Sequence, residues 1–285
     1  SLTARSSSST VSFLNPRPES QLMEPAWIIV AIAVMLIGVT KSGFGSGLGL
    51  LNVPLIVIAM GYTAHGSQAA LGLMLPLLII GDIIAVVQYR KLFKPSLLRK
   101  LLPGSIVGVV LGYLLLSWFH RQQELMNALI RLEIGLECII LVSLHWWREA
   151  RGMQKSLLRE PLRGTATGAF AGVSSTLAHA AGPVIAMYLL PLNLPRQQFV
   201  GTSAFYFFML NSFKVPFYWF AGMFALVPWG ISLSLAPLVL VGAIIGWFVL
   251  KRLSDRVFMK IVYVVTFMLG WYLLADGLWK LLPRG

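Results

Sequence analysis

The sequence predicts an all-α protein that crosses a membrane several times, as two inverted repeats of about five helical segments each. Composition is the first observation behind this prediction, because 57% of the 285 residues are hydrophobic and only 12% are charged. Such a chain lies outside the range of soluble globular domains. The second observation is an internal repeat, and the third is an asymmetry of charge between loops.

Apolar runs support the helical segments, and several of them approach the roughly 20 residues that a membrane crossing needs. Others are short or interrupted by Gly and Pro, so eight to ten segments are expected, including short broken helices. The runs cover 26–40, 48–61, 69–81, 101–119, 134–147, 164–194, 197–213, 215–250 and 261–275. The expected organisation is a flexible tail (1–24) without a signal-peptide core, two repeats (25–147 and 164–282) and a basic cytoplasmic connector (148–163).

The internal repeat appears when the chain is shifted against itself by 129 positions, the difference between 43 and 172. Gly and Pro residues then match in order, and Gln68 falls on Gln197 and Asp82 on Asn211. Matched Gly, Pro and Gln are far more informative in an apolar chain than matched Leu, so the pattern indicates duplication.

Loop charges predict that the second copy is inverted, since Lys and Arg gather on the cytoplasmic side. The loop at 89–100 is strongly basic, whereas its counterpart WFAGMFALVPW in the second copy has no basic residue. Loops 89–100 and 148–163 are therefore expected in the cytoplasm and both termini in the periplasm. The net charge of +13 then reflects orientation in the membrane, and no nucleic-acid partner is expected.

The stretch KSGFGSG at 41–47 interrupts the first copy with three glycines between apolar runs. Bare backbone survives within a bilayer only where protein or a cavity satisfies it, so the stretch predicts a helix that stops and restarts as a half-helix. The second copy has the matching stretch GVSSTLAHAAGP at 172–183. Because the start of a half-helix attracts anions, we expect a small anionic substrate between the copies.

The candidate substrate-binding residues surround these two predicted breaks. The alternative for any single glycine is close packing of helices, and His179 could equally be a satisfied polar contact. The candidates are Lys41, Ser42, Gly43, Gly45, Ser46, Gly47, Asn52, Ser174, Ser175, Thr176, His179 and Gly182.

Polar residues inside the apolar runs are further functional candidates, because they are costly in a bilayer. Asp82 could carry a coupling proton or only accept hydrogen bonds, and Lys214 could pair with the anion. Glu133 and Glu137 share a helix face, and a structural ion pair with Lys214 is favoured for this segment, while Arg131 is expected to reach the surface. The polar intramembrane candidates are Asp82, Gln68, Gln197, Asn211 and Lys214.

A Gly-rich break followed by an apolar run with proline occurs twice, as LLNVPLIVIAMG and AAGPVIAMYLLPL. Each is followed by a G-S-Q or R-Q-Q segment, and this arrangement resembles the sulfite exporter family TauE/SafE over 26–281. The resemblance implies export of sulfite or a related organosulfur anion across the bacterial inner membrane without ATP hydrolysis. In the second copy LAHAA stands where the family pattern has a glycine cluster, so His179 takes the place of a small residue.

An enzyme is disfavoured, because no metalloprotease, paired-aspartate or Walker motif is present and no histidine follows Ser175 in the later apolar segments. A passive anion channel of the same architecture remains the nearer alternative. The single cysteine, Cys138, speaks against disulfides and most metal chemistry, so no cofactor or metal is expected. The expected partners are a small anion, the lipid bilayer and a coupling ion, for which protons are the candidate.

Overall fold

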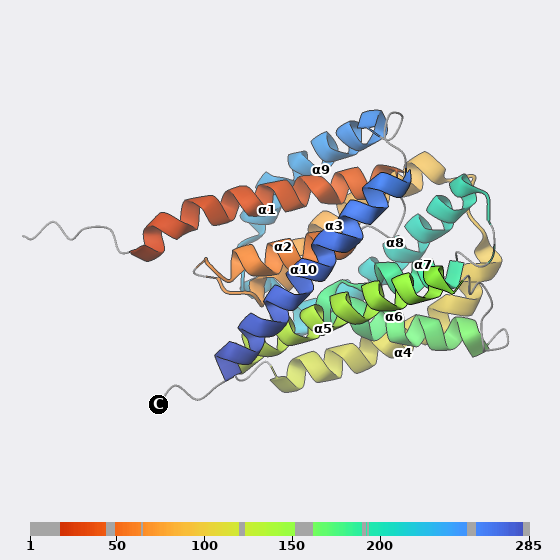
Figure 1. Ribbon diagram of the computed structural model, residues 1–285. Coiled ribbons are helices and arrows are strands. Elements are labelled where there is room, and N and C mark those ends of the chain that lie inside the picture. Colours follow the sequence, from red (N-terminus) through yellow and green to blue (C-terminus); the bar gives the residue numbers. More distant parts are fainter. Residues whose placement is uncertain are drawn as a thin grey trace, which may run out of the picture.

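The chain forms a bundle of helices in the computed structural model (Figure 1). The structure describes residues 18–43, 49–63, 65–119, 123–151, 162–189, 192, 194–249 and 255–281. Within these ranges there is no β-strand. The prediction of an all-α membrane protein is confirmed.

Ten α-helices follow one another, five in each half of the described chain. The first half contains α1 (Pro18–Gly43), α2 (Gly49–Met60), α3 (Ala69–Tyr89), α4 (Pro95–Phe119) and α5 (Gln123–Ala150). The second half contains α6 (Leu162–Ala178), α7 (Ala181–Leu189), α8 (Arg196–Phe220), the short 3₁₀ helix η3 (Met223–Ala225), α9 (Trp229–Val249) and α10 (Asp255–Leu281).

Two of these helices, α2 and α7, are half-helices, as the Gly and Pro pattern predicts. They contain 12 and 9 residues, which correspond to about 18 and 14 Å, against roughly 30 Å of hydrocarbon in a bilayer. Helix α1 begins at Pro18, inside the segment expected to be a flexible tail. Proline is well suited to a first helical position, because it lacks the N–H that is unpaired there.

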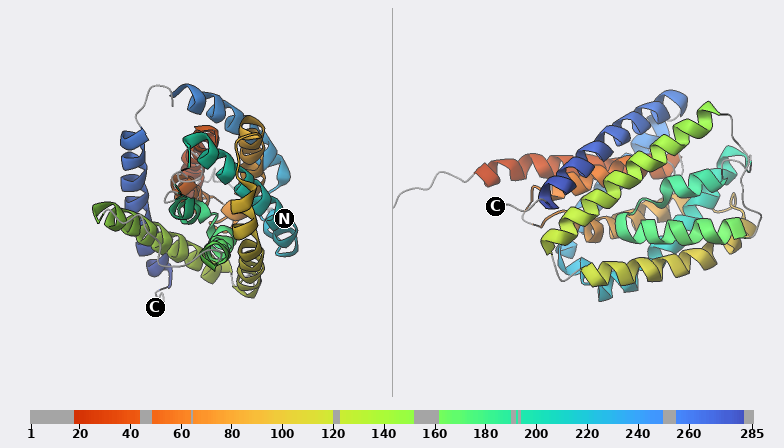
Figure 2. Two further views of the ribbon diagram at one scale, coloured as in Figure 1. Left: turned by 90° about the vertical axis from the view of Figure 1, so that its right-hand side faces the viewer. Right: turned by 60° about the horizontal axis from the view of Figure 1, so that its bottom comes forward.

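Five of the described helices are long and apolar enough to cross a membrane by length and composition. These are α1, α3, α4, α9 and α10, over the windows Pro25–Ser42, Ala69–Tyr89, Pro95–Trp118, Trp229–Gly246 and Tyr263–Leu281. In the windows of α9 and α10 only 22% of the residues are buried, and both helices lie at the periphery in the end-on view (Figure 2, left). Large exposed apolar side chains on these helices fit contact with lipid.

The loops gather at two opposite ends of the bundle (Figures 1 and 2). At one end Lys94 N donates to Thr202 Oγ1 over 3.0 Å, and Arg163 donates to the Tyr188 carbonyl over 3.0 Å. At the other end Tyr62 and Tyr272 share a hydrogen bond of 2.7 Å, and the ring of Trp27 contacts the ring of His65. The described loop residues assigned to the cytoplasm from charge therefore lie at one end.

The two halves exchange their first helices, since α1 packs along α9 and α6 packs along α4. Glycines allow this close approach. A Cβ at Gly38 would lie 2.0 Å from the Val239 carbonyl oxygen, and a Cβ at Gly108 would lie 2.1 Å from that of Ala169. For these glycines the packing interpretation holds. The inverted repeat itself stays a prediction, although a first-to-fourth exchange in both halves is the arrangement it expects.

Candidate functional site

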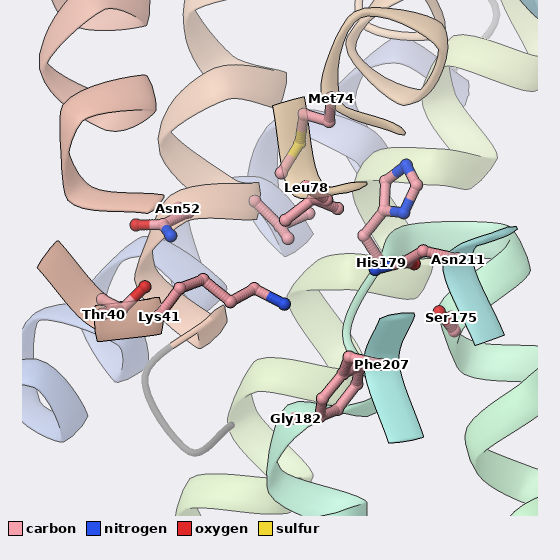
Figure 3. Close-up of a pocket in the computed structure, with 11 residues that line it drawn as sticks. Thr40, Lys41, Asn52, Met74, Leu78, Ser175, His179, Gly182, Phe207 and Asn211 are labelled. Carbon is pink, nitrogen blue, oxygen red and sulfur yellow. The ribbon is translucent and has the colours of Figure 1, made fainter. Parts of the chain in front are cut away.

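A cavity of about 30 Å³ lies between two clusters of buried apolar side chains. One cluster joins α1, α2 and α3 to part of the second half, and the other joins α4, α6, α7 and α8. The starts of both half-helices border it, at Asn52 and Gly182 (Figure 3). The lining residues are Thr40, Lys41, Asn52, Val53, Met74, Leu78, Ser175, His179, Gly182, Phe207 and Asn211.

The break between α6 and α7 is made by His179, whose backbone φ is +53°. A residue in this left-handed conformation commonly ends a helix, and it is usually glycine. The break lies within the stretch predicted at 172–183, but Ser174, Ser175 and Thr176 precede it in the last turns of α6. Helix α7 restarts at Ala181. The break predicted in the first copy falls at 44–48, outside the described residues.

One charged group reaches the cavity from the first half. Lys41 forms an ion pair with Asp82 of α3, and the amine lies 4.8 Å from the ring centroid of Phe207. Asn211 of α8 donates to the other Asp82 oxygen over 2.6 Å. The repeat superposes Asp82 on Asn211. In the predicted inverted repeat, equivalent residues contact each other only close to the two-fold axis, so this contact marks the expected position of that axis.

A second lysine reaches the same region from α8. The Lys214 amine donates to the carbonyl oxygen and the hydroxyl of Ser175 and to His179 Nδ1, each over 2.9 Å. His179 Nε2 lies 3.0 Å from the Leu71 carbonyl oxygen. An imidazole that accepts at Nδ1 and donates at Nε2 is neutral, so these contacts assign its tautomer.

The formal charge of this centre is positive. Lys214 and Asp82 are both 0% exposed, and Asp82 lies close enough to Lys214 to act on it electrostatically. Asp82 already pairs with Lys41, however, and among the described residues the Lys214 amine contacts only neutral acceptors. Desolvating a charge without a counterion costs several kcal/mol, so this part of the bundle attracts an anion.

The structure brings together five of the predicted substrate-binding residues and one polar intramembrane candidate, Asn211. Of the described candidates, Ser42 and Thr176 bond instead to helix carbonyls, at Val39 and Gly172, and Gly43 closes α1. Gly45, Ser46 and Gly47 lie outside the described residues. The six that line the cavity are Lys41, Asn52, Ser175, His179, Gly182 and Asn211.

Three polar candidates lie away from the cavity. Gln197 is exposed in the first turn of α8. Gln68 precedes α3, where its backbone N–H donates to Asn127 Oδ1 over 2.8 Å. Ser174 donates to Glu137 of α5. Lys214, by contrast, stands directly behind the cavity through Ser175 and His179.

Sequence reasoning missed the apolar wall of the cavity, formed by Val53, Met74, Leu78 and Phe207. Figure 3 shows Lys41 extending between Leu78 and Phe207 toward the side where His179, Asn211 and Ser175 lie. A signal was present, because the shift that superposes Asp82 on Asn211 also superposes Leu78 on Phe207.

Two expectations for α5 are wrong. Arg131 does not reach the surface, because it is 2% exposed and forms an ion pair with Asp276 of α10 and a 2.8 Å hydrogen bond to Ser67. The expected ion pair with Lys214 does not form among the described residues either. In α6, the Ser174 hydroxyl donates to the Glu137 carboxyl, and the Ser175 hydroxyl accepts a hydrogen bond from Lys214.

Long apolar helices, paired half-helices and a charged cavity at their starts define a multi-pass membrane protein of the transporter class. The chain belongs to the sulfite exporter TauE/SafE family, whose family model matches residues 30–273. This is a family of membrane transporters for sulfite or related anions, which fits a role other than catalysis. No curated protein and no solved structure is detectably similar to the chain.

Proposed function

We propose that the protein is a secondary transporter that exports sulfite or a small organosulfur anion by alternating access between two inverted halves. The proposed membrane is the bacterial inner membrane, with the basic loops cytoplasmic and both termini periplasmic. The anion binds in the cavity beside Lys41 and in front of Lys214. The observation that carries this proposal is the excess of buried positive charge at the cavity, with two lysines and one aspartate.

Electrostatics support an anionic ligand over a cationic one. A counterion near Lys214 recovers part of the free energy lost on burying its charge. The first turn of α7 adds backbone N–H groups that have no acceptor within the helix, and it places the positive end of the helix dipole beside Gly182. Asn52 and Ser175 add side-chain donors at the cavity wall. Hydrogen bonds from these donors do not require one fixed shape of ligand, which suits a small oxyanion.

The size of the cavity supports alternating access over a passive channel. A volume of about 30 Å³ holds roughly two water molecules, less than an oxyanion with four non-hydrogen atoms requires. The anion therefore binds only after the walls separate. The two apolar clusters meet at the cavity, so their relative movement opens and closes it.

Flux measurements with purified protein in proteoliposomes test the proposal. Labelled sulfite loaded inside is expected to exchange with sulfite, thiosulfate or sulfoacetate outside, with and without a pH gradient, and counterflow against a gradient separates a carrier from a channel. Ser175→Ala is expected to lower the exchange rate about tenfold, whereas the surface variant Lys260→Met leaves it unchanged. Wild-type vesicles without exchange of any of these anions would refute the transport function.

Topology is tested separately with reporter fusions at positions 94 and 225. Position 94 lies beside Thr202, whereas η3, which ends at Ala225, packs with α3 at the opposite end, where Gln68 Nε2 lies 4.0 Å from Met223 Sδ. The expected result is a cytoplasmic signal at 94 and a periplasmic signal at 225. The same signal from both positions would remove the proposed inverted arrangement.

A further inference from the structure

Helix α5 carries two carboxyl groups in the middle of its length. The helix has 28 residues, enough for about 42 Å, and Glu133 and Glu137 lie one turn apart near its centre. The helix packs against α10, α2, α6 and α4. Two acidic side chains at this depth are costly in a bilayer unless they are neutralised.

Glu133 and Glu137 lie one turn apart on the same face of α5, so their carboxyl groups are close enough to interact electrostatically. Ser174 of α6 donates to Glu137 Oε1. Glu137 is 8% exposed, and Oε2 of each glutamate is buried without a hydrogen-bond partner among the described residues. A buried carboxylate oxygen without a donor or counterion is costly, whereas a proton bound by the pair removes one charge and supplies a donor between the two carboxyl groups.

The groups that face this carboxyl pair are neutral. Cys138 follows Glu137 on the same helix, and the Tyr218 hydroxyl from α8 is close enough to Glu133 to interact electrostatically. Ser174 is the contact from α6. No lysine, arginine or histidine of the described residues from α10, α2 or α4 forms an ion pair with either glutamate. A proton is therefore the ligand that neutralises the pair.

Helix α6 joins this pair to the anion cavity through consecutive residues. Ser174 donates to Glu137, and Ser175 accepts from Lys214 and lines the cavity. Tyr218 bridges the same elements, because its hydroxyl donates to the Thr176 carbonyl over 2.6 Å. A change of charge on α5 thus acts on the same turn of α6 that hydrogen-bonds to Lys214.

We propose that Glu133 and Glu137 form the proton-binding site that couples anion transport to a pH gradient. This inference rests on the proposed transport function and adds the coupling site to it. One proton binds to a carboxylate oxygen of the pair when the site faces one side and leaves as a hydrated proton on the other. Loss of that proton leaves two carboxylates in contact, which repel each other and disturb the bond from Ser174.

The test compares Glu133→Gln/Glu137→Gln with wild type in proteoliposomes. Glutamine keeps the size and the hydrogen bonds of a protonated carboxyl but cannot exchange a proton. The double variant is expected to keep sulfite counterflow at equal pH within about twofold and to lose at least tenfold in accumulation driven by a pH gradient. Glu149→Gln is the matched control, because Glu149 lies at the exposed end of the same helix, 74% accessible, and it is expected to behave like wild type.

Infrared spectroscopy of the purified protein gives a second readout that needs no transport. The wild type and Glu149→Gln are expected to show a protonated carboxyl band that titrates and that disappears in the double variant. A band unaltered in the double variant overturns the assignment, even if that variant is poorly folded for transport.

The outcomes separate the two proposals. Wild-type vesicles with no anion flux would refute transport and, with it, the coupling. Wild-type flux that ignores the pH gradient, or that follows a sodium gradient instead, refutes only the coupling. Gradient-driven accumulation by the double variant equal to that of wild type also refutes it.

Discussion

The two lysines at the centre of the bundle are held in opposite ways. Lys41 comes from the end of α1 and pairs with the carboxylate of Asp82, whereas Lys214 comes from α8 and, among the described residues, hydrogen-bonds to Ser175 and His179 and faces the ring of Tyr218. The first charge is neutralised within the protein and the second is not. We therefore expect Lys41 to contribute mainly to the stability of the fold, and the role proposed for Lys214 is to supply the net charge that a transported anion balances.

The largest effect is expected for Lys41→Met, which removes the ion pair between Lys41 and Asp82. Asp82 is fully buried, so its carboxylate loses its counterion, and removal of one partner of a buried pair costs about 3 kcal/mol or more. The apparent melting temperature in detergent should fall by about 10 °C. Lys41→Met/Asp82→Asn should recover most of this loss, and a single variant as stable as wild type would show that the pair carries no stability.

The second-largest effect is expected for Lys214→Met, which distinguishes the role of this lysine from that of Lys41. The neutral partners of Lys214 lose no counterion, so the melting temperature should change by only a few degrees. Sulfite counterflow should fall about 100-fold, equivalent to about 2.7 kcal/mol. Lys260→Met controls for the loss of a lysine at an exposed position. Equal flux in Lys214→Met and wild type would contradict the role assigned to the net charge.

A smaller effect tests the role of His179. This residue has a left-handed backbone conformation, and its imidazole accepts a hydrogen bond from Lys214. Glycine adopts this conformation freely, so His179→Gly should keep the helix break and lower counterflow about tenfold through loss of the imidazole. His179→Ala should be less stable than His179→Gly by about 1 kcal/mol, because alanine is strained at a φ of +53°. Thermal unfolding of the two variants makes the comparison, and equal stability would remove the strain argument.

The smallest expected effect concerns Tyr218, whose ring faces the Lys214 amine at 5.7 Å and whose hydroxyl donates to the Thr176 carbonyl. Tyr218→Phe keeps the ring and removes one hydrogen bond, so about 1 kcal/mol of stability should be lost. Counterflow should stay within about twofold. A tenfold loss would instead place the hydroxyl among the groups that contact the anion.

Much of the fold could be predicted from the sequence because membrane helices satisfy their own backbone. Gly and Pro punctuation identified α2 and α7 as half-helices without any knowledge of tertiary contacts. The position of the second break was predicted less well, since His179 rather than a glycine adopts the left-handed conformation. Only the surrounding contacts of its imidazole, with Lys214 and the Leu71 carbonyl, explain why histidine occupies that position.

The candidate site was predicted only in part, because spacing along the sequence does not show which helices pack together. Spacing along a helix shows that Glu133 and Glu137 share a face, but it does not show which helix they meet, and the expected partner Lys214 proved to lie on the other side of α6. The repeat predicted that Asp82 and Asn211 are equivalent, yet their direct contact depends on how the two halves pack.

The exchange of first helices also constrains how the protein is made. Gly38 of α1 fits against the backbone at Val239 and Gly242 of α9, so the glycine face of α1 lacks its partner until α9 has been synthesised. At about 5–20 residues per second, the roughly 200 intervening residues take on the order of 10 to 40 s to synthesise. Throughout that interval the glycine face of α1 has no α9 to pack against.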